Sequence, residues 1–305
     1  MTRVAVLLAI ALLLAWPVRA RLVRARWTAL APRAAIVLWQ AIGLAFGVAV
    51  LGACFELACA PSDCVGLWAR ITDLVGALVA NRPAHALTPG QLFGLTAGLL
   101  IATPLFTAVA PRAVRFVRAR DHHRMLVDLV GDEWVGTTNV LVLEHPQAIA
   151  YSLAGMHSRV VVSSGAIEAL SDDEILAVLA HERAHLHARH DLVLLPFRSL
   201  SSVLPASEVL AAVNRHVRGL IEMAADDCAR RECEPGALAR ALCRLATTGV
   251  PSVALGASSD NMAVRVERVL SPRPSAKLVA LGSGLSAIGV VALPLVAILL
   301  TLGGR

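Results

Sequence analysis

The chain has 305 residues, of which 57% are hydrophobic, and a formal net charge of +6 at pH 7. With a mean hydropathy of +0.68, it is too apolar for an ordinary soluble domain, so we expect membrane segments. The charge comes almost wholly from arginines that flank apolar runs. Because no helix carries a basic stripe with interleaved aromatics, direct nucleic-acid binding is disfavoured.

Four apolar segments are predicted to span the membrane: about 4–18, 34–55, 91–110 and 278–302. The first is short, but arginines follow it instead of a small-x-small cleavage site, so we interpret it as a retained helix rather than a signal peptide. The second and fourth are free of charged side chains over about twenty residues, the length that crosses the hydrocarbon core. Pro104 is expected to kink the third.

The charged connections predict the orientation. Arginines crowd the stretches after the first and third segments, and Arg273 and Lys277 precede the fourth. Since positive charge marks the cytoplasmic side, we expect a multi-pass protein of the cell membrane with its N-terminus outside. The predicted domains are a membrane region at 1–111, a cytosolic domain at 112–277, and a last membrane helix with a short tail at 278–305.

Cysteines give a second view of this topology. Cys59 and Cys64 lie in the connection placed outside, where an oxidising compartment favours a small disulfide loop. Two unpaired thiols are the alternative. Cys228 and Cys233 lie in the cytosolic part without CxxC spacing, so we interpret them as reduced packing residues.

The cytosolic part predicts an α+β fold with a small antiparallel sheet. Short apolar runs at 140–143, 148–153 and 160–163 are typical of strands. Ser171 and Glu174 form a capping box that begins a helix, and further helices are predicted at about 207–233, 236–246 and 262–270.

The third strand precedes the capped helix directly. We therefore predict that Val160, Val161, Val162 and Ser163 form the exposed edge of a cleft, where an extended substrate peptide can pair as an added strand. A buried strand is the alternative.

The sequence VLAHERAHLHARHD, at 178–191, carries the strongest chemical signal. His181 and His185 are four apart, so on a helix they lie on one face and can bind the same ion. Zinc accepts two such nitrogens and needs a third protein ligand, leaving one position open. Glu182 can then act as the base that takes a proton from water. This HExxH pattern predicts one Zn²⁺ per chain; two surface histidines are the alternative.

Two residues compete as the third ligand. Asp191 lies ten residues after His181, the metzincin spacing, but that arrangement needs a turn after the second histidine. Ala188 is a helix former, so we expect the helix to continue and Asp191 to be structural. We prefer Glu222, on the later helix, as the third ligand.

Neighbours of these ligands complete the prediction. Asp226, one turn after Glu222, can hold a ligand histidine from behind, whereas Asp227 lacks the four-residue spacing. His187 and His190 are expected to face away from the His181 stripe.

The HERAH motif, the later Glu-x-x-x-Asp pair and a cytosolic domain between the last two spans together resemble the BlaR/MecR-type membrane metallopeptidases. The resemblance implies a gluzincin-like zinc endopeptidase that cleaves a cytosolic protein, typically a winged-helix transcriptional repressor, in a signalling pathway. Because the sequence ends three residues after the fourth segment, we expect no external β-lactam sensor domain. The sequence does not indicate the oligomeric state.

Two other functions remain open. The motif is shared with HtpX-type membrane proteases that degrade damaged membrane proteins. A non-catalytic membrane receptor with a zinc site is the alternative of another class, but a structural zinc site does not need the Glu182 carboxylate beside an open position.

Overall fold

The computed structural model describes residues 2–58, 72, 75–76, 79, 88–134, 137–155, 157–248, 259–271 and 277–303. The chain divides into two compact units, Met1–Ala108 with Lys277–Arg305, and Val109–Ala276. The sequence-predicted boundaries, at 111/112 and 277/278, lie within a few residues of these divisions. Cys59 and Cys64, the predicted disulfide pair, lie outside the described residues.

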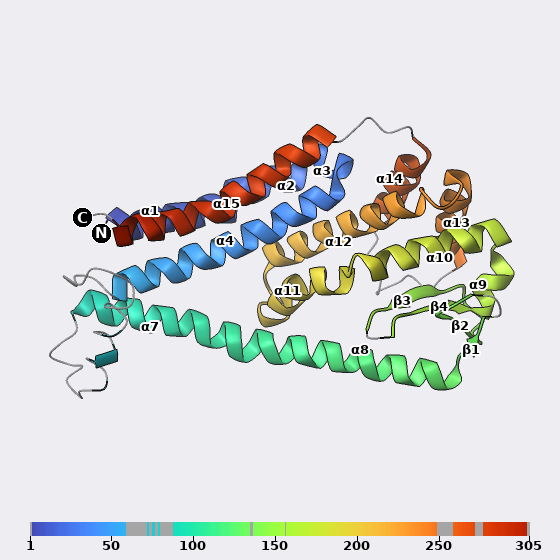
Figure 1. Ribbon diagram of the computed structural model, residues 1–305, viewed down its shortest axis with the longest axis horizontal. Helices are drawn as coiled ribbons and strands as arrows, with labels where there is room; N and C mark the ends of the chain where they lie inside the picture. The colour runs from blue at the N-terminus through green and yellow to red at the C-terminus, as the bar shows by residue number, and fades with distance from the viewer. Residues whose placement is uncertain are drawn as a thin grey trace. The chain divides into compact units, whose positions relative to one another are not determined.

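Nearly all described residues of the first unit are helical (Figure 1). Its helices include α1 (Thr2–Leu13), η1 (Leu14–Val18), α2 (Arg19–Arg24), α3 (Trp27–Leu30), α4 (Pro32–Ala58), α7 (Pro89–Pro104), η2 (Leu105–Val109) and α15 (Lys277–Gly303). The buried alanines Ala35, Ala45 and Ala49 of α4 allow the backbones of neighbouring helices to approach closely.

Three stretches of the described chain are long and apolar enough to cross a membrane: Thr2–Arg24, Pro32–Ala58 and Val279–Ile298. They coincide with three of the four predicted spans. The segment 91–110 is helical, but α7 ends at Pro104 and the π-helix η2 follows. Proline removes a backbone donor and breaks the regular hydrogen-bond ladder. That the segment 91–110 spans the membrane remains a prediction.

The second unit combines helices with a sheet. Its elements are α8 (Ala110–Val130), β1 (Asp132–Glu133), β2 (Val140–Leu143), β3 (Ala150–Leu153), β4 (Arg159–Ser163), α9 (Ser164–Ala169), α10 (Asp172–His187), α11 (His190–Val203), α12 (Glu208–Ala229), α13 (Pro235–Thr248) and α14 (Ser259–Leu270). The strand order is β1-β2-β4-β3. β2 and β4 are parallel and the other pairs are antiparallel. The sheet is therefore mixed, and the prediction of an antiparallel sheet was wrong.

The strand β4 lies inside the sheet. It pairs with β2 on one side and β3 on the other over Val160, Val161, Val162 and Ser163, and all four side chains are buried. The prediction that these residues form a substrate edge is therefore wrong, because their backbone groups already pair within the sheet. A continuous run of valines is typical of a strand covered on both faces. β3 is the edge strand on this side.

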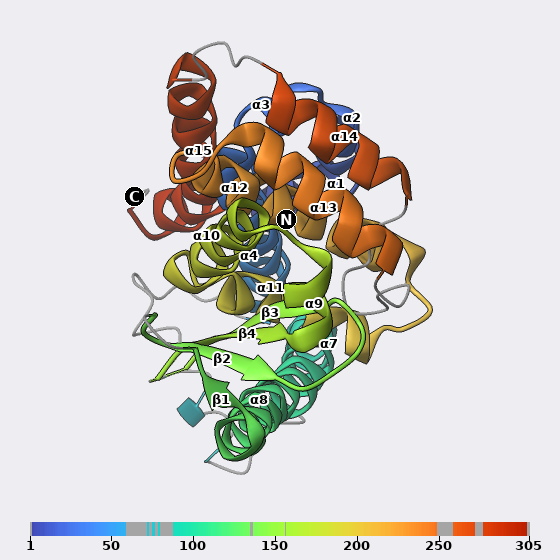
Figure 2. The same ribbon diagram turned by 90° about the vertical axis from the view of Figure 1, so that its right-hand side faces the viewer.

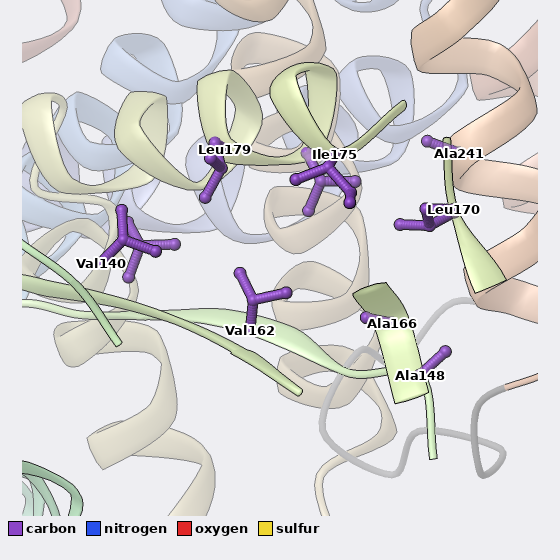
Figure 3. Packing of buried hydrophobic residues seen from close by; sticks show 10 residues of the cluster. Val140, Ala148, Val162, Ala166, Leu170, Ile175, Leu179 and Ala241 are labelled. Atoms are coloured by element: carbon purple, nitrogen blue, oxygen red, sulfur yellow. The ribbon is translucent and has the colours of Figure 1, made fainter. Parts of the chain in front are cut away.

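Helices cover both faces of the sheet (Figure 2). Alternation along the strands sends Val140 and Val162 toward Ile175 and Leu179 of α10, as Figure 3 shows. Val161 points the other way, into a second cluster that includes Val127 of α8. Full burial of one such side chain stabilises the fold by about 1.5–3 kcal/mol. Packing of this kind fixes α10 on the sheet.

The start of α10 is held as predicted. The backbone N–H of Ser171 donates to Glu174 Oε2 at 3.0 Å, which completes the capping box. The Glu174 side chain is 1% exposed and lies 3.3 Å from Arg240 Nε and 3.5 Å from Arg244 Nη1, both on α13. The cap therefore also ties α10 to its neighbour, which fixes the rotation of the helix that carries the histidines.

The end of α10 differs from the prediction. The helix ends at His187, and Arg189 adopts a left-handed backbone with φ of 49° before α11 begins at His190. We expected Ala188 to continue the helix. The turn forms without glycine, at a residue type that rarely adopts this conformation.

Candidate metal centre

Two helices bring three potential metal ligands together. His181 and His185 lie one turn apart on α10, and their Nε2 atoms are 3.1 Å from each other. Glu222 reaches them from α12, with Oε2 3.5 Å from His181 Nε2 and Oε1 3.8 Å from His185 Nε2. One donor atom from each residue lies within 4.8 Å of the others. The structure thus brings together the three residues that the sequence proposed as ligands.

Each of these three side chains is held by a further residue. The contacts are Asp226 Oδ1 to His181 Nδ1 at 3.0 Å, His190 Nδ1 to His185 Nδ1 at 3.0 Å, and Arg265 Nη1 to Glu222 Oε2 at 3.2 Å. Partners of this kind fix the orientation of metal ligands and tune their affinity. The cluster therefore has the supporting contacts that a preorganised metal centre needs.

Asp226 was chosen over Asp227 from helical spacing, and the two side chains do point in different directions. Asp226 is 1% exposed and faces His181. Asp227 instead pairs with Arg268 of α14. Adjacent residues on a helix differ by about 100° in direction, so only one of the two can support the ligand histidine.

His190 is a correction to the sequence analysis. We expected it to face away from the ligand stripe, but it is 6% exposed and its ring contacts His185 edge to face. The turn at Arg189 redirects the chain, so helical spacing no longer predicts where the side chain points. His187 is exposed, as expected, and its Nδ1 lies 2.8 Å from the carbonyl oxygen of Arg183.

Asp191 takes a structural role. It lies in the first turn of α11 and pairs with Arg120 of α8. We rejected Asp191 as a ligand because we expected the helix to continue past Ala188. That reason was wrong, since α10 ends at His187 and the chain turns before Asp191. Its carboxylate nevertheless binds Arg120, on another helix.

Sequence reasoning missed Arg265 altogether. It lies on α14, and its side chain is only 5% exposed. Nothing local distinguishes it, because an arginine on an amphipathic helix is most often solvated. The sequence offered only an indirect signal. Two acids one turn apart, Glu222 and Asp226, need a nearby cation to offset their charge if both are buried.

Charges within the cluster are arranged for a cation. Burial works to lower the pKa of His181, but contacts with Asp226 and Glu222 outweigh it and raise the pKa to about 10. Burial lowers the pKa of His185 to about 3. Although burial opposes its charge, Glu222 has a pKa lowered to about 2, chiefly by its hydrogen bond with His181. The metal-free chain thus holds a proton on His181, between neutral His185 and anionic Glu222, where a divalent cation can replace it. The donor set suits zinc.

Glu182 follows the first histidine directly. Burial raises its pKa to about 7, although the positive charge of His181 and a hydrogen bond with Ser152 of β3 oppose the shift. A carboxyl group with a pKa near neutrality can both accept and donate a proton at physiological pH. Its contact with Ser152 also brings the edge strand beside this carboxyl group.

Comparisons with known proteins point in the same direction. Residues 119–260 match the family model described as Peptidase family M48, and this range contains all three candidate ligands and Glu182. Together with the apolar helices, the match supports a membrane metallopeptidase. No curated protein matches the chain.

Among solved structures, the crystal structure of S. mikatae Ste24p is similar. The two chains are 14% identical, the alignment covers 88% of this chain and 99% of the other, and the TM-score is 0.39. This similarity is too low to assign a shared fold.

Proposed function

We propose that this protein is an integral membrane zinc endopeptidase that holds one zinc ion through His181, His185 and Glu222. The observation that carries the proposal is Glu182, a carboxyl group with a pKa near 7 beside three converging donors. A purely structural zinc site has no use for such a group, which favours an enzyme over a zinc-containing receptor. The match of residues 119–260 to a peptidase family supports the same conclusion.

The chemistry divides between the metal and Glu182. A zinc ion held at this site supplies a Lewis acid that polarises the scissile carbonyl and lowers the pKa of water. Glu182 takes the proton from the attacking water and delivers it to the amide nitrogen as the C–N bond breaks. Ser152 orients the Glu182 carboxyl group through its hydrogen bond, while Asp226 holds His181 by its Nδ1 atom.

We propose the edge strand β3 as the place where substrate binds. In the described part of the sheet β3 pairs only with β4. The N–H of Ser163 donates to the carbonyl of Ile149, and hydrogen-bonded and non-hydrogen-bonded pairs alternate in an antiparallel ladder. The backbone groups of Ala150 and Ser152 therefore face the free side. An extended peptide can pair there as an added strand, next to Glu182.

We propose that the substrate is a cytosolic protein, cleaved within a flexible segment. The arginine-rich connections support a cytoplasmic peptidase domain. The resemblance of the HERAH motif and the later Glu-x-x-x-Asp pair to antirepressor peptidases supports a winged-helix repressor in a signalling pathway. The alternative function is degradation of damaged membrane proteins, and the experiment below distinguishes it from cleavage of a cytosolic repressor.

The test uses the purified full chain, loaded with zinc, and its Glu182→Gln variant. Each is incubated with a candidate winged-helix repressor and, separately, with an unfolded membrane protein, and the products are identified by mass spectrometry. Glutamine preserves shape but cannot accept a proton, so the variant should keep its zinc while cleavage falls by about 10²–10⁴-fold. Cleavage of the unfolded membrane protein alone would favour quality control. Undiminished turnover in the variant would remove Glu182 from the reaction and refute the proposed mechanism.

A further inference from the structure

We propose that Arg265 is a positioning residue of the metal centre, which holds Glu222 so that it offers one oxygen to the metal. This inference rests on the proposed function. Arg265 lies on α14, beyond the residues 119–260 that match the peptidase family, and no sequence motif includes it.

One guanidinium group joins two carboxylates that lie one turn apart on α12. Its Nε and Nη2 atoms donate to Asp226 Oδ2 and Oδ1, both at 2.9 Å, and Nη1 lies 3.2 Å from Glu222 Oε2. A planar guanidinium fixes such contacts in direction as well as distance. Arg265 therefore couples the candidate ligand Glu222 to Asp226, the residue that holds His181.

Burial makes these three charged side chains energetically costly unless they stay paired with one another. The Arg265 side chain is 5% exposed, the Asp226 side chain 1% and the Glu222 side chain 16%. A buried charge is tolerated only when it is paired and hydrogen-bonded. Because each of these three charges is stabilised by its contacts with the others, the Glu222 side chain has little freedom to rotate when a metal binds or leaves.

The contact with Oε2 has a consequence for coordination. Glu222 Oε2 is shared between Arg265 and His181, whereas Oε1 is the oxygen nearer to His185. A carboxylate whose second oxygen is held by a guanidinium is disfavoured from binding a metal through both oxygens. Arg265 thereby keeps a coordination position free for water and substrate, which a catalytic zinc site requires.

Arg268 provides a matched control on the same helix. It lies one turn after Arg265 and forms a similar fork onto Asp227, the neighbour of Asp226 on α12. It also donates to the carbonyl oxygen of Met223 at 3.3 Å. Both arginines dock α14 onto α12, but only Arg265 contacts a candidate ligand.

The experiment compares Arg265→Gln and Arg265→Lys with Arg268→Gln and Arg268→Lys in the purified full chain. Zinc affinity is measured by competition with a chelator, cobalt coordination by visible absorption of Co²⁺-loaded protein, and stability by thermal unfolding of the metal-free chain. We expect both Arg265 variants to bind zinc about 10–100-fold more weakly, as is typical when a residue that supports a ligand is lost, with an altered cobalt spectrum. The Arg268 variants should lower Tm but keep the affinity and the spectrum of the wild type.

The lysine variant keeps the proposal testable if Arg265→Gln fails to fold. Lysine retains a positive charge against Asp226, but its single ammonium group cannot replace the three contacts. Wild-type affinity and cobalt spectrum in Arg265→Lys would overturn the assignment, as would equal affinity losses at positions 265 and 268. A wild-type chain that binds no zinc would overturn the proposed function itself, and this assignment with it.

Discussion

The Nδ1 atom of His190 lies 3.0 Å from the Nδ1 atom of His185. This contact occupies the side of the His185 ring that points away from the cluster, so it directs Nε2 toward His181 and Glu222. A ligand imidazole is usually held through its other nitrogen in this way. His190 therefore orients His185 in the same way that Asp226 orients His181.

His190→Ala should weaken zinc binding about 10-fold or more, because His185 loses the partner that fixes its ring. His187→Ala is the control, since that side chain is exposed and its Nδ1 lies near the carbonyl oxygen of Arg183 on its own helix. Chelator competition measures both affinities. Equal affinity in the two variants would show that His190 is only a packing residue.

Glu222→Ala should reduce the zinc content from about one per chain to near zero, because a three-residue site rarely survives the loss of one ligand. Asp191→Ala should keep its zinc and unfold at a lower temperature, since Asp191 pairs with Arg120 instead. Elemental analysis of the purified variants measures zinc per chain. Zinc retained in the first variant and lost in the second would reverse the ligand assignment.

Zinc binding should release close to one proton, and the dissociation constant should rise about tenfold for each unit by which pH falls between about 8.5 and 7. The sign follows from His181, whose pKa of about 10 keeps it protonated in the metal-free chain throughout this range. His185, with a pKa of about 3, is already neutral and contributes no further proton.

Calorimetry in buffers of different ionisation enthalpy counts the protons released. Asp226→Asn is the matched variant, because it removes a carboxylate that raises the pKa of His181 and should therefore reduce proton release. An affinity that does not change with pH would show that His181 is not protonated before metal binds.

Ala150→Pro should slow cleavage of an extended substrate by about 2- to 12-fold, the equivalent of one hydrogen bond worth about 0.5–1.5 kcal/mol. Ala150 begins β3, where proline is tolerated, and its N–H faces the free side of the sheet. Ala150→Val keeps that N–H and serves as the control. Zinc content and solubility should not change in either variant, and unchanged cleavage by the proline variant would argue against substrate pairing along β3.

The proposed cytoplasmic orientation of the peptidase domain predicts a labelling pattern. Cys243 is exposed and unpaired on α13, so a membrane-impermeant thiol reagent should modify it only after cells are permeabilised. After reduction, Cys59 and Cys64 should react in intact cells, and a Cys59→Ser/Cys64→Ser variant identifies their share of the signal. Modification of Cys243 in unbroken cells would reverse the predicted topology.

Local patterns in the sequence were enough to predict several parts of the molecule. Apolar segments long enough to cross a bilayer coincide with three helices, and the capping box begins α10 at the predicted residue. Four-residue spacing placed His181 beside His185, and Asp226 on the same face as Glu222. These predictions depend on interactions within one turn or one helix, where backbone geometry alone sets the direction of a side chain.

Only the tertiary structure decided which elements become neighbours. We expected β4 at the edge of the sheet, but it pairs with both β2 and β3. Strand order depends on long-range packing, which a run of valines does not encode. The left-handed turn at Arg189 brings His190 back onto His185, a conformation for which arginine gives no local signal. Arg265 reaches Glu222 from a separate helix, and its role follows from two buried carboxylates that become close only after α14 packs against α12.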